Sequence, residues 1–278
     1  MKSWPLFKHI RGGTSAFVVA ATIAGVGLGY GAMAYAQAPE SNKLADAKPG
    51  EVRLFVSGSV RAPVLAIQAR LEQVTGRKIV VESSESRILL KEIDAGQPFE
   101  AALLITSVVD DLVAKGKLVP GSQMKIGAIG VGVAVRGDAP KLDVSTAEGL
   151  KRAILGAHSI RRFYGVGASV PVLDNLFTKL GLLETTQNKM VRLGGDQVVP
   201  EAPLPPGQYE LIINLISAVI PMKGWTYLGP IPEQFQMPVS HSAGLGASGD
   251  LALGRRVMTV LKEPAFQAAL RANGFTAE

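Results

Sequence analysis

The chain has 278 residues, of which 47% are hydrophobic and 6% aromatic, and this composition suits an α/β protein of one or two units. Its formal net charge is +6, which falls to +3 once Lys2, Lys8 and Arg11 of an N-terminal leader are removed. No basic stripe is interleaved with aromatic residues, so the sequence does not predict nucleic-acid binding.

Cysteine is absent from the sequence, which excludes disulfides, thiolate catalysis, Cys-ligated zinc and a lipoprotein anchor. Three histidines occur, and one of them, His9, lies in the leader. No metal-ligand spacing can be built from the other two, His158 and His241. We therefore expect neither a metal nor another cofactor.

The N-terminus has the pattern of a signal peptide. Basic residues in the first 13 positions are followed by an apolar, Gly-rich run over 16–33, which ends in Ala34-Tyr35-Ala36. This small-x-small pattern is one that signal peptidase accepts, so we predict a signal peptide over 1–36, cleavage after Ala36 and a periplasmic protein. An uncleaved membrane anchor is the alternative. Residues 37–50 are polar and Pro-flanked, and they are predicted to form a flexible lead-in.

From residue 51 onward, short apolar strands alternate with segments of helical spacing. Strands are expected at 53–57, 78–81, 101–105, 124–135, 159–164, 189–193, 209–216 and 226–228. Helices are expected at 63–73, 86–95, 107–115, 146–155, 170–180, 251–261 and 264–272. The Pro-rich stretch 200–207 is expected to be a surface loop. This alternation predicts the α/β class, with parallel-rich sheets covered by helices on both faces.

Ser and Gly gather at three predicted strand–helix junctions, which are Ser57-Gly58-Ser59, Ser83-Ser84-Glu85-Ser86 and the segment 164–169 that ends in Ser169. Ligands of such sheets bind at the carboxyl ends of strands, where free helix N–H groups favour anions. Gly58 and Gly167 let the backbone approach a ligand closely. The alternative is that each Ser is an ordinary helix N-cap.

Two arginines, Arg61 and Arg87, follow the first two junctions and have the fork geometry that holds a carboxylate or oxyanion. Solvated surface arginines are the alternative, and for Arg161 and Arg162 the solvated state is the prediction. His241 is expected to be structural. No Ser-His-Asp set follows from the spacing, so no catalytic residue is predicted.

A family resemblance covers roughly residues 52–277. It is carried by the order of VSGSVRAPVLAIQARLEQVTGRKIVV, SVVDDLVAKGKLVPG, IGVGVAVRGDAP, GASVPVLDNLFTKLGL and YLGPIPEQFQ. Together these segments resemble the periplasmic molybdate-binding proteins of ABC transporters. The resemblance implies a type II periplasmic binding fold, with two α/β lobes and a hinge of two crossing strands. The first lobe would comprise 51–130 and 232–278, and the second lobe 131–231.

The resemblance also implies a ligand site. Ser59 and Ser86 match the two serines that hold the oxyanion in that family, and Ser169 matches a backbone amide. The second crossing carries 214–217 without the family's Tyr, which leaves a molybdate- or tungstate-like oxyanion and a small carboxylate both open. The implied partners are a small anion and an ABC permease in the membrane, with the protein a monomer. A periplasmic aconitate isomerase resembles this fold too, so an isomerase with Glu85 or His241 as the base is the alternative function.

Overall fold

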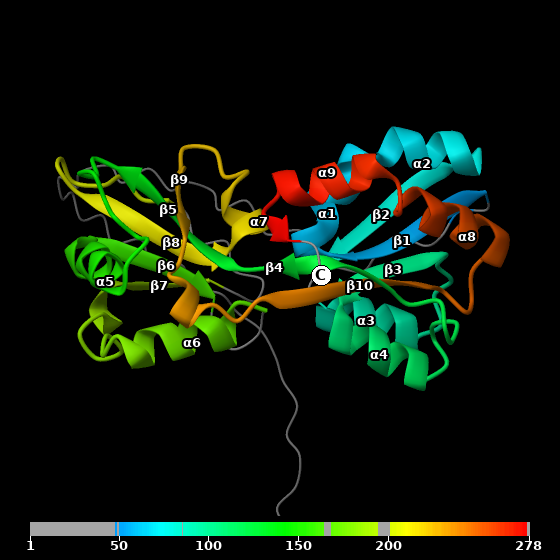
Figure 1. Ribbon diagram of the computed structural model, residues 1–278, viewed down its shortest axis with the longest axis horizontal. Helices are drawn as coiled ribbons and strands as arrows, with labels where there is room; N and C mark the ends of the chain where they lie inside the picture. Colours follow the sequence, from blue (N-terminus) through cyan, green and yellow to red (C-terminus); the bar gives the residue numbers. More distant parts are fainter. Residues whose placement is uncertain (1–47, 49, 85, 164–167, 194–200, 277–278) are drawn as a thin grey trace, which may run out of the picture. The chain divides into compact units, whose positions relative to one another are not determined.

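The computed structural model describes residues 48, 50–84, 86–163, 168–193 and 201–276 (Figure 1). The helices and strands of these residues lie between Glu51 and Thr276, so the fragment 37–278 contains all of them. None of the described helices combines the length and the apolar character needed to cross a bilayer. The strands form two sheets, and we call each sheet with its covering helices a lobe.

The sheet of the first lobe has six strands among the described residues, in the order β11-β4-β10-β3-β1-β2. They are β1 (Glu51–Ser57), β2 (Lys78–Ser84), β3 (Ala101–Ile105), β4 (Met124–Ile129), β10 (Val239–Leu245) and β11 (Phe275–Thr276). Strand β1 pairs in parallel with β2 and β3, whereas β10 runs antiparallel between β3 and β4. A strand from the C-terminal part of the chain thus occupies the middle of this sheet.

Helices cover both faces of this sheet (Figure 1). They are α1 (Gly58–Ala66), α2 (Gln68–Thr75), α3 (Ser86–Asp94), α4 (Thr106–Ala114), α8 (Leu251–Val260) and α9 (Pro264–Ala272). Alternation along β1 explains the two layers, because successive side chains of a strand point to opposite faces. Leu54 belongs to the same buried cluster as Val60 of α1 and Phe266 of α9, whereas Phe55 belongs to a second cluster with Leu89 of α3 and Val109 of α4.

The second lobe contains a five-stranded sheet among the described residues, in the order β7-β6-β8-β5-β9. Its strands are β5 (Val131–Gly137), β6 (Ser159–Phe163), β7 (Met190–Leu193), β8 (Tyr209–Leu215) and β9 (Thr226–Pro230), and its helices are α5 (Ala147–Gly156), α6 (Val170–Lys179) and α7 (Ile216–Val219). Strand β6 is parallel to β7 and β8, and β5 is antiparallel to β8. The α/β class and the two-lobed fold predicted from the sequence are confirmed.

The chain passes between the lobes through two segments. The first is the single residue Gly130 between β4 and β5, and the second is 231–238, which contains a 3₁₀ turn between β9 and β10. The side chain of Gln236 joins the two segments. Its Oε1 accepts from the Val131 N–H at 2.9 Å, and its Nε2 donates to the carbonyls of Val131 at 2.8 Å and Ile231 at 3.0 Å. We call this set of hydrogen bonds the Gln236 bridge.

The prediction of one continuous strand over 124–135 was wrong. The apolar run is divided at Gly130 into β4 and β5, which belong to different sheets. A Cβ at position 130 would lie 2.8 Å from Gln236 Oε1, so a glycine suits the point of passage. The expected helix over 63–73 also differs, because the chain forms α1 and α2 with a break at Ile67.

The prediction that Arg161 and Arg162 are solvated was wrong as well, since only 5% and 1% of these residues are exposed. Arg162 forms an ion pair with Asp174 of α6. On the opposite face Arg161 Nε lies 3.0 Å from Glu210 Oε2, an oxygen that also lies 2.6 Å from Arg136. Each buried cation therefore has an acidic partner, as the cost of burying an unpaired charge requires.

Candidate functional site

The strand directions bring several strand–helix junctions to the edges where the chain passes between lobes. In the first sheet, Val239 at the start of β10 pairs with Ile129 at the end of β4, and His241 pairs with Ile105 at the end of β3. In the second sheet, the start of β5 pairs with the end of β8, to which β6 is parallel. We use the term crossing edges for two sheet edges. One is the edge of the first sheet at which β3 and β4 end, and the other is the edge of the second sheet at which β5 starts and β6 and β8 end.

Three of the helices that begin at the crossing edges, α1, α4 and α6, lack a side-chain cap. At the N-caps of α1, α4 and α6, which are Ser57, Ile105 and Ser169, the side chain makes no capping hydrogen bond. The helices α5 and α8, which follow β5 and β10 and so begin at other edges, are capped by Thr146 and Asp250, whereas α2 and α9 also lack a side-chain cap. N–H groups in a first turn that no side chain satisfies are donors available to an anion.

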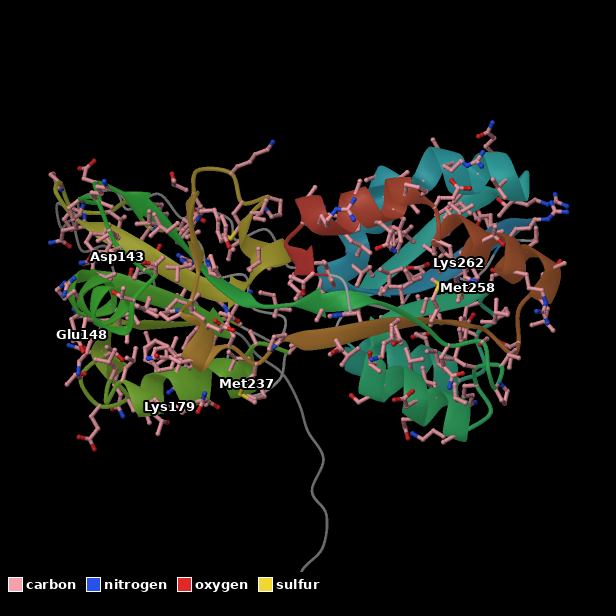
Figure 2. All side chains as sticks on the ribbon, viewed as in Figure 1. Asp143, Glu148, Lys179, Met237, Met258 and Lys262 are labelled. Carbon is pink, nitrogen blue, oxygen red and sulfur yellow. The ribbon has the colours of Figure 1, made fainter. Side chains whose placement is uncertain are left out.

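A cavity of about 330 Å³ joins the two crossing edges. It is lined by Thr106 and Ser107 at the start of α4, by Pro171 and Val172 at the start of α6, and by 237–240 before and within β10. Met237, which leads into β10, is one of its lining residues (Figure 2). The remaining lining residues are Ile105 and Ala168. The volume of this cavity is typical of a small-molecule site, and the uncapped starts of α4 and α6 form part of its wall.

Next to this cavity, three polar side chains form a hydrogen-bonded row. Ser57 Oγ lies 3.1 Å from Ser59 Oγ, and Ser59 Oγ lies 2.7 Å from His241 Nε2. His241 Nδ1 lies 2.9 Å from the carbonyl oxygen of Val239, which lines the cavity. His241 is fully buried, whereas Ser59, the second residue of α1, is half-buried. We call this set the Ser57–Ser59–His241 row.

Two local features place His241. The pairing of β10 with β4 shifts register between His241 and Ser242, and such bulges redirect side chains and are frequent beside functional sites. Phe275 of β11 packs edge-on against the imidazole with the ring centres 5.3 Å apart. The opposite face of β10 carries a second polar pair, in which Ser242 Oγ lies 2.9 Å from Thr106 Oγ1.

The structure places the predicted site residues unequally. Gly58 and Ser59 begin α1, Arg61 is exposed on the same helix, and Ser169 is buried at the start of α6. Ser86 and Arg87 begin α3, but their side chains lie outside the described part, as do residues 85 and 167 entirely. In the structure Ser59 therefore contacts His241, and residues that flank Ser169 in the chain line the same cavity as the start of α4.

Sequence reasoning missed Thr106, Ser107 and the contact between Ser59 and His241. A hydroxyl at the start of α4 follows an apolar strand as the other serines do, so the junction argument applied to 105–107 would have found the first two. The contact with His241 spans 182 positions along the chain and follows from the placement of β10 beside β3.

A larger hollow of about 460 Å³ lies at the opposite edge of the first sheet. It includes Met124 at the start of β4, Leu245 at the end of β10, and Met258 and Lys262 near the end of α8 (Figure 2). No parallel strand of this sheet ends there, so this hollow lacks the helix starts that mark the crossing edges. Among the described residues, no group of three or more His, Asp or Glu is placed to hold a metal ion.

Solved structures with this fold include binders of oxyanions. The periplasmic molybdate-binding protein of Azotobacter vinelandii is 17% identical, with a TM-score of 0.61, 82% of this chain covered and 99% of that one. The tungstate-binding protein TupA of Desulfovibrio alaskensis G20 is 12% identical, with a TM-score of 0.52, 79% of this chain covered and 93% of that one. These likenesses define the class of the fold as a type II periplasmic binding protein.

The chain matches the family described as bacterial extracellular solute-binding proteins over residues 52–276, and it belongs to that family. The resemblance to molybdate-binding proteins that the sequence predicts is thereby confirmed. The chain is also similar to an aconitate isomerase from Pseudomonas sp, with 25% identity over 195 residues, which is 68% of this chain and 73% of that enzyme.

Proposed function

We propose that this protein is the periplasmic substrate-binding component of an ABC transporter and that it binds a small anion between its lobes. The single observation that carries the proposal is the cavity at the crossing edges, whose wall contains the uncapped starts of α4 and α6. Each helix start stabilises a negative charge by about 0.3–1 kcal/mol, and several of them converging favour an anion over a neutral solute.

The ligand is either a molybdate- or tungstate-like oxyanion or a small carboxylate. Hydroxyl groups and backbone N–H groups at Ser59, Ser86 and Ser169 suit the oxyanion, with Gly58 and Gly167 giving the backbone close access. Arg61 and Arg87 suit the carboxylate, because a guanidinium holds two carboxylate oxygens at once. Binding between the lobes would stabilise the closed form of the hinge.

Export and delivery belong to the same proposal. The leader over 1–36 would be cleaved after Ala36, and the lobes, with 51–130 and 232–278 in the first and 131–231 in the second, would close on the ligand in the periplasm. The closed monomer would then present the anion to the membrane permease.

Thermal unfolding of residues 37–278 tests this function. We would compare molybdate, tungstate, sulfate, phosphate, citrate and both aconitates, since a ligand at 100 times its dissociation constant adds about 2.7 kcal/mol of stability. Ser59→Ala is expected to weaken binding by about 1–3 kcal/mol, because a buried hydrogen bond at the ligand is lost. Ser145→Ala is the matched control, since Ser145 is exposed and bonds locally to Asp143. Equal affinity in the two variants would remove Ser59 from the site.

The arginines distinguish the two ligand classes. A carboxylate held in a bidentate way loses affinity on Arg61→Lys or Arg87→Lys as well as on replacement by Ala. If the affinity is unchanged when either arginine is replaced by Lys or Ala, both arginines are surface residues that do not contact the ligand.

A second candidate function is isomerisation of an unsaturated organic acid such as aconitate. The observation in its favour is the 2.7 Å contact between Ser59 and His241, in a chain similar to an aconitate isomerase. In that reaction His241 would take a proton from one carbon of the acid through the Ser59 hydroxyl, and the pair would return a proton to another carbon. Interconversion of cis- and trans-aconitate that His241→Gln abolishes would establish this function, and no interconversion by the wild type would exclude it.

A further inference from the structure

The larger hollow of the first lobe lies at the edge of the sheet opposite to the crossing edge. We call it the α8 hollow, and it is lined by 119–124, Leu245, Arg255, Met258, Thr259 and Lys262. Its volume of about 460 Å³ is about fifteen times the ~30 Å³ that one water occupies in the liquid. This is room for a small organic molecule, and all of the lining residues belong to one lobe.

One wall of the α8 hollow is the segment 119–123, which is tied to the end of β10. The Val119 N–H donates to the Leu245 carbonyl at 2.9 Å, and the Leu245 N–H donates to Ser122 Oγ at 3.0 Å. Within the segment, the N–H and the hydroxyl of Ser122 both donate to the Val119 carbonyl, at 3.2 and 2.6 Å. Gly121 takes the positive φ of +74° that this turn requires. The wall therefore has a fixed shape without any ligand.

The other wall is one face of α8 and of the turn that follows it. Four residues of this face line the hollow, namely Arg255, Met258, Thr259 and Lys262. Their spacing of three, four and seven positions puts them on the same side of a helix. The turn continues this face beyond the last helical residue, because the Lys262 N–H donates to the Thr259 carbonyl at 3.1 Å.

The side chains of the two walls give the hollow an apolar floor between two cations. Met258 and Leu245 are buried, Met124 is half-buried, and the three side chains supply the floor. Arg255 and Lys262 are exposed and lie two helical turns apart, about 10 Å, with Met258 between them in the chain (Figure 2 labels Met258 and Lys262). A positive charge thus stands near each end of the apolar floor.

Neither cation is neutralised within the described part of the chain. There, the side chains of Arg255 and Lys262 make no ion pair and no hydrogen bond, and the lining residues include no acid. The two acids nearest to α8 in sequence have other partners. Asp250 accepts from N–H groups of the first turn of α8, and Glu263 pairs with Arg70 at 2.9 Å. Both cations are therefore available to a ligand.

We propose that the α8 hollow is a second binding site, for an organic dianion that has an apolar chain between its two charged ends. The charged ends meet Arg255 and Lys262, and the chain lies on Met124, Leu245 and Met258. A bare oxyanion has nothing to place on the apolar floor, and a neutral chain leaves both cations without a partner. This site does not rest on the anion-binding function proposed for the crossing edges.

Methionine methyl NMR of residues 37–278 locates a ligand directly. Five of the seven methionines of the chain lie in this fragment, namely Met124, Met190, Met222, Met237 and Met258. Suberate, a straight-chain diacid, is the probe. We expect it to shift the methyl resonances of Met124 and Met258, which line the α8 hollow, and to leave Met237 unchanged, which lines the cavity at the crossing edges.

Two comparison probes separate the contributions of the chain and of the charges. Succinate has the two carboxylates but a shorter chain, and it is expected to bind at least tenfold more weakly than suberate, because each buried methylene favours binding about fourfold. Octane-1,8-diol has the chain without the charges. It too is expected to bind more weakly, because each exposed ion pair contributes up to about fivefold. Suberate that binds no tighter than either probe would overturn the inference.

Substitution of the two cations tests the residues. Replacing Arg255 and Lys262 together by Gln is expected to weaken suberate binding about tenfold and to remove the shift of Met258. Arg256→Gln is the matched control, because Arg256 is exposed on the same helix but lies outside the lining, with Nη1 3.5 Å from the Val74 carbonyl oxygen. Unchanged methyl resonances of the second lobe show that the fold is kept. A double variant that binds suberate like the control would refute the site.

The outcomes separate this inference from the proposed function. If suberate shifts Met237 alone, it binds at the crossing edges, and the α8 hollow is refuted as a site while the proposed function stands. If suberate shifts Met124 and Met258 but no anion shifts Met237 or stabilises the protein, the α8 site stands and the proposed function fails. If suberate shifts no methionine, the inference made here fails, whatever molybdate or aconitate does at Met237.

Discussion

Replacing Glu210 by Gln is expected to destabilise the second lobe by about 3 kcal/mol. Glu210 is 2% exposed, and its Oε2 lies within 3.0 Å of both Arg136 and Arg161. Breaking a buried ion pair costs about 3–5 kcal/mol, because the remaining charge stays buried. The lower end applies here, since Ser159 bonds to Oε1 at 2.6 Å and its hydroxyl can turn to accept from a Gln amide. The hydrogen bonds then survive and only the charge is lost.

Urea unfolding followed by tryptophan fluorescence measures this change. Residues 37–278 contain a single tryptophan, Trp225, which lies 5.5 Å from the Arg136 guanidinium and therefore reports on this lobe. Glu201→Gln is the matched control, because Glu201 is 45% exposed, 3.9 Å from the same arginine, and keeps an acceptor for the Trp225 N–H. The control is expected to cost less than about 1 kcal/mol.

The pH dependence of the stability that Glu210 contributes through its ion pairs gives a second check. Burial acts to raise the pKa of Glu210, but hydrogen bonds from Ser159, Arg161 and Arg136 outweigh it, and the pKa is lowered overall. The stability that the carboxylate contributes is therefore complete above the ordinary glutamate pKa of about 4.3 and is lost as pH falls through the lowered value.

A Glu210→Gln variant as stable as Glu201→Gln at neutral pH would refute the reasoning.

Four other substitutions have expected outcomes. Asp174→Asn should cost about 3 kcal/mol in urea unfolding, because it removes the negative charge beside Arg162, which is 1% exposed, and Arg162→Ala should cost a similar amount through the lost packing of its buried stem; a loss below about 1 kcal/mol in Asp174→Asn would contradict this. Thr146→Ala should cost about 1 kcal/mol through the lost N-cap of α5 and leave anion affinity unchanged, and a change in affinity would show that α5 is coupled to the site. Gln236→Ala should cost about 1–3 kcal/mol, since Val131 N–H loses its acceptor, and thermal unfolding without a measurable shift would show that water replaces the bridge.

The sequence predicted several helices and strands with the bounds that the structure shows. The strand at 101–105 and the helix at 264–272 have the expected bounds, and α5, expected over 146–155, begins with Thr146 as its N-cap, which accepts from the Gly149 N–H. It failed at Gly130, because apolar residues continue through the passage and hydropathy does not say to which sheet a strand belongs.

The burial of polar residues was harder to predict, because it depends on partners distant in the chain. Arg161 pairs with Glu210, and His241 contacts Ser59 across 182 positions. The segment 239–245 contains two serines and a histidine, so it lacks the apolar pattern of a central strand even though it lies between β3 and β4. The Ser and Gly residues at the strand–helix junctions did indicate the edge of the sheet that carries the candidate site. They did not indicate that His241 lies there.

The Gln236 bridge limits the insertions and deletions that the segment 231–238 can accept. The segment 231–238 has one short 3₁₀ turn and lies outside both sheets, a place where loops usually accept insertions and deletions. Yet Gln236 must reach both Ile231, five positions earlier, and Val131, 105 positions earlier. Adding or removing one residue between 231 and 236 would carry the amide away from Val131. The length of this segment is therefore constrained by the bridge, as its composition is by Gln236 and by the buried Ile231 and Phe235.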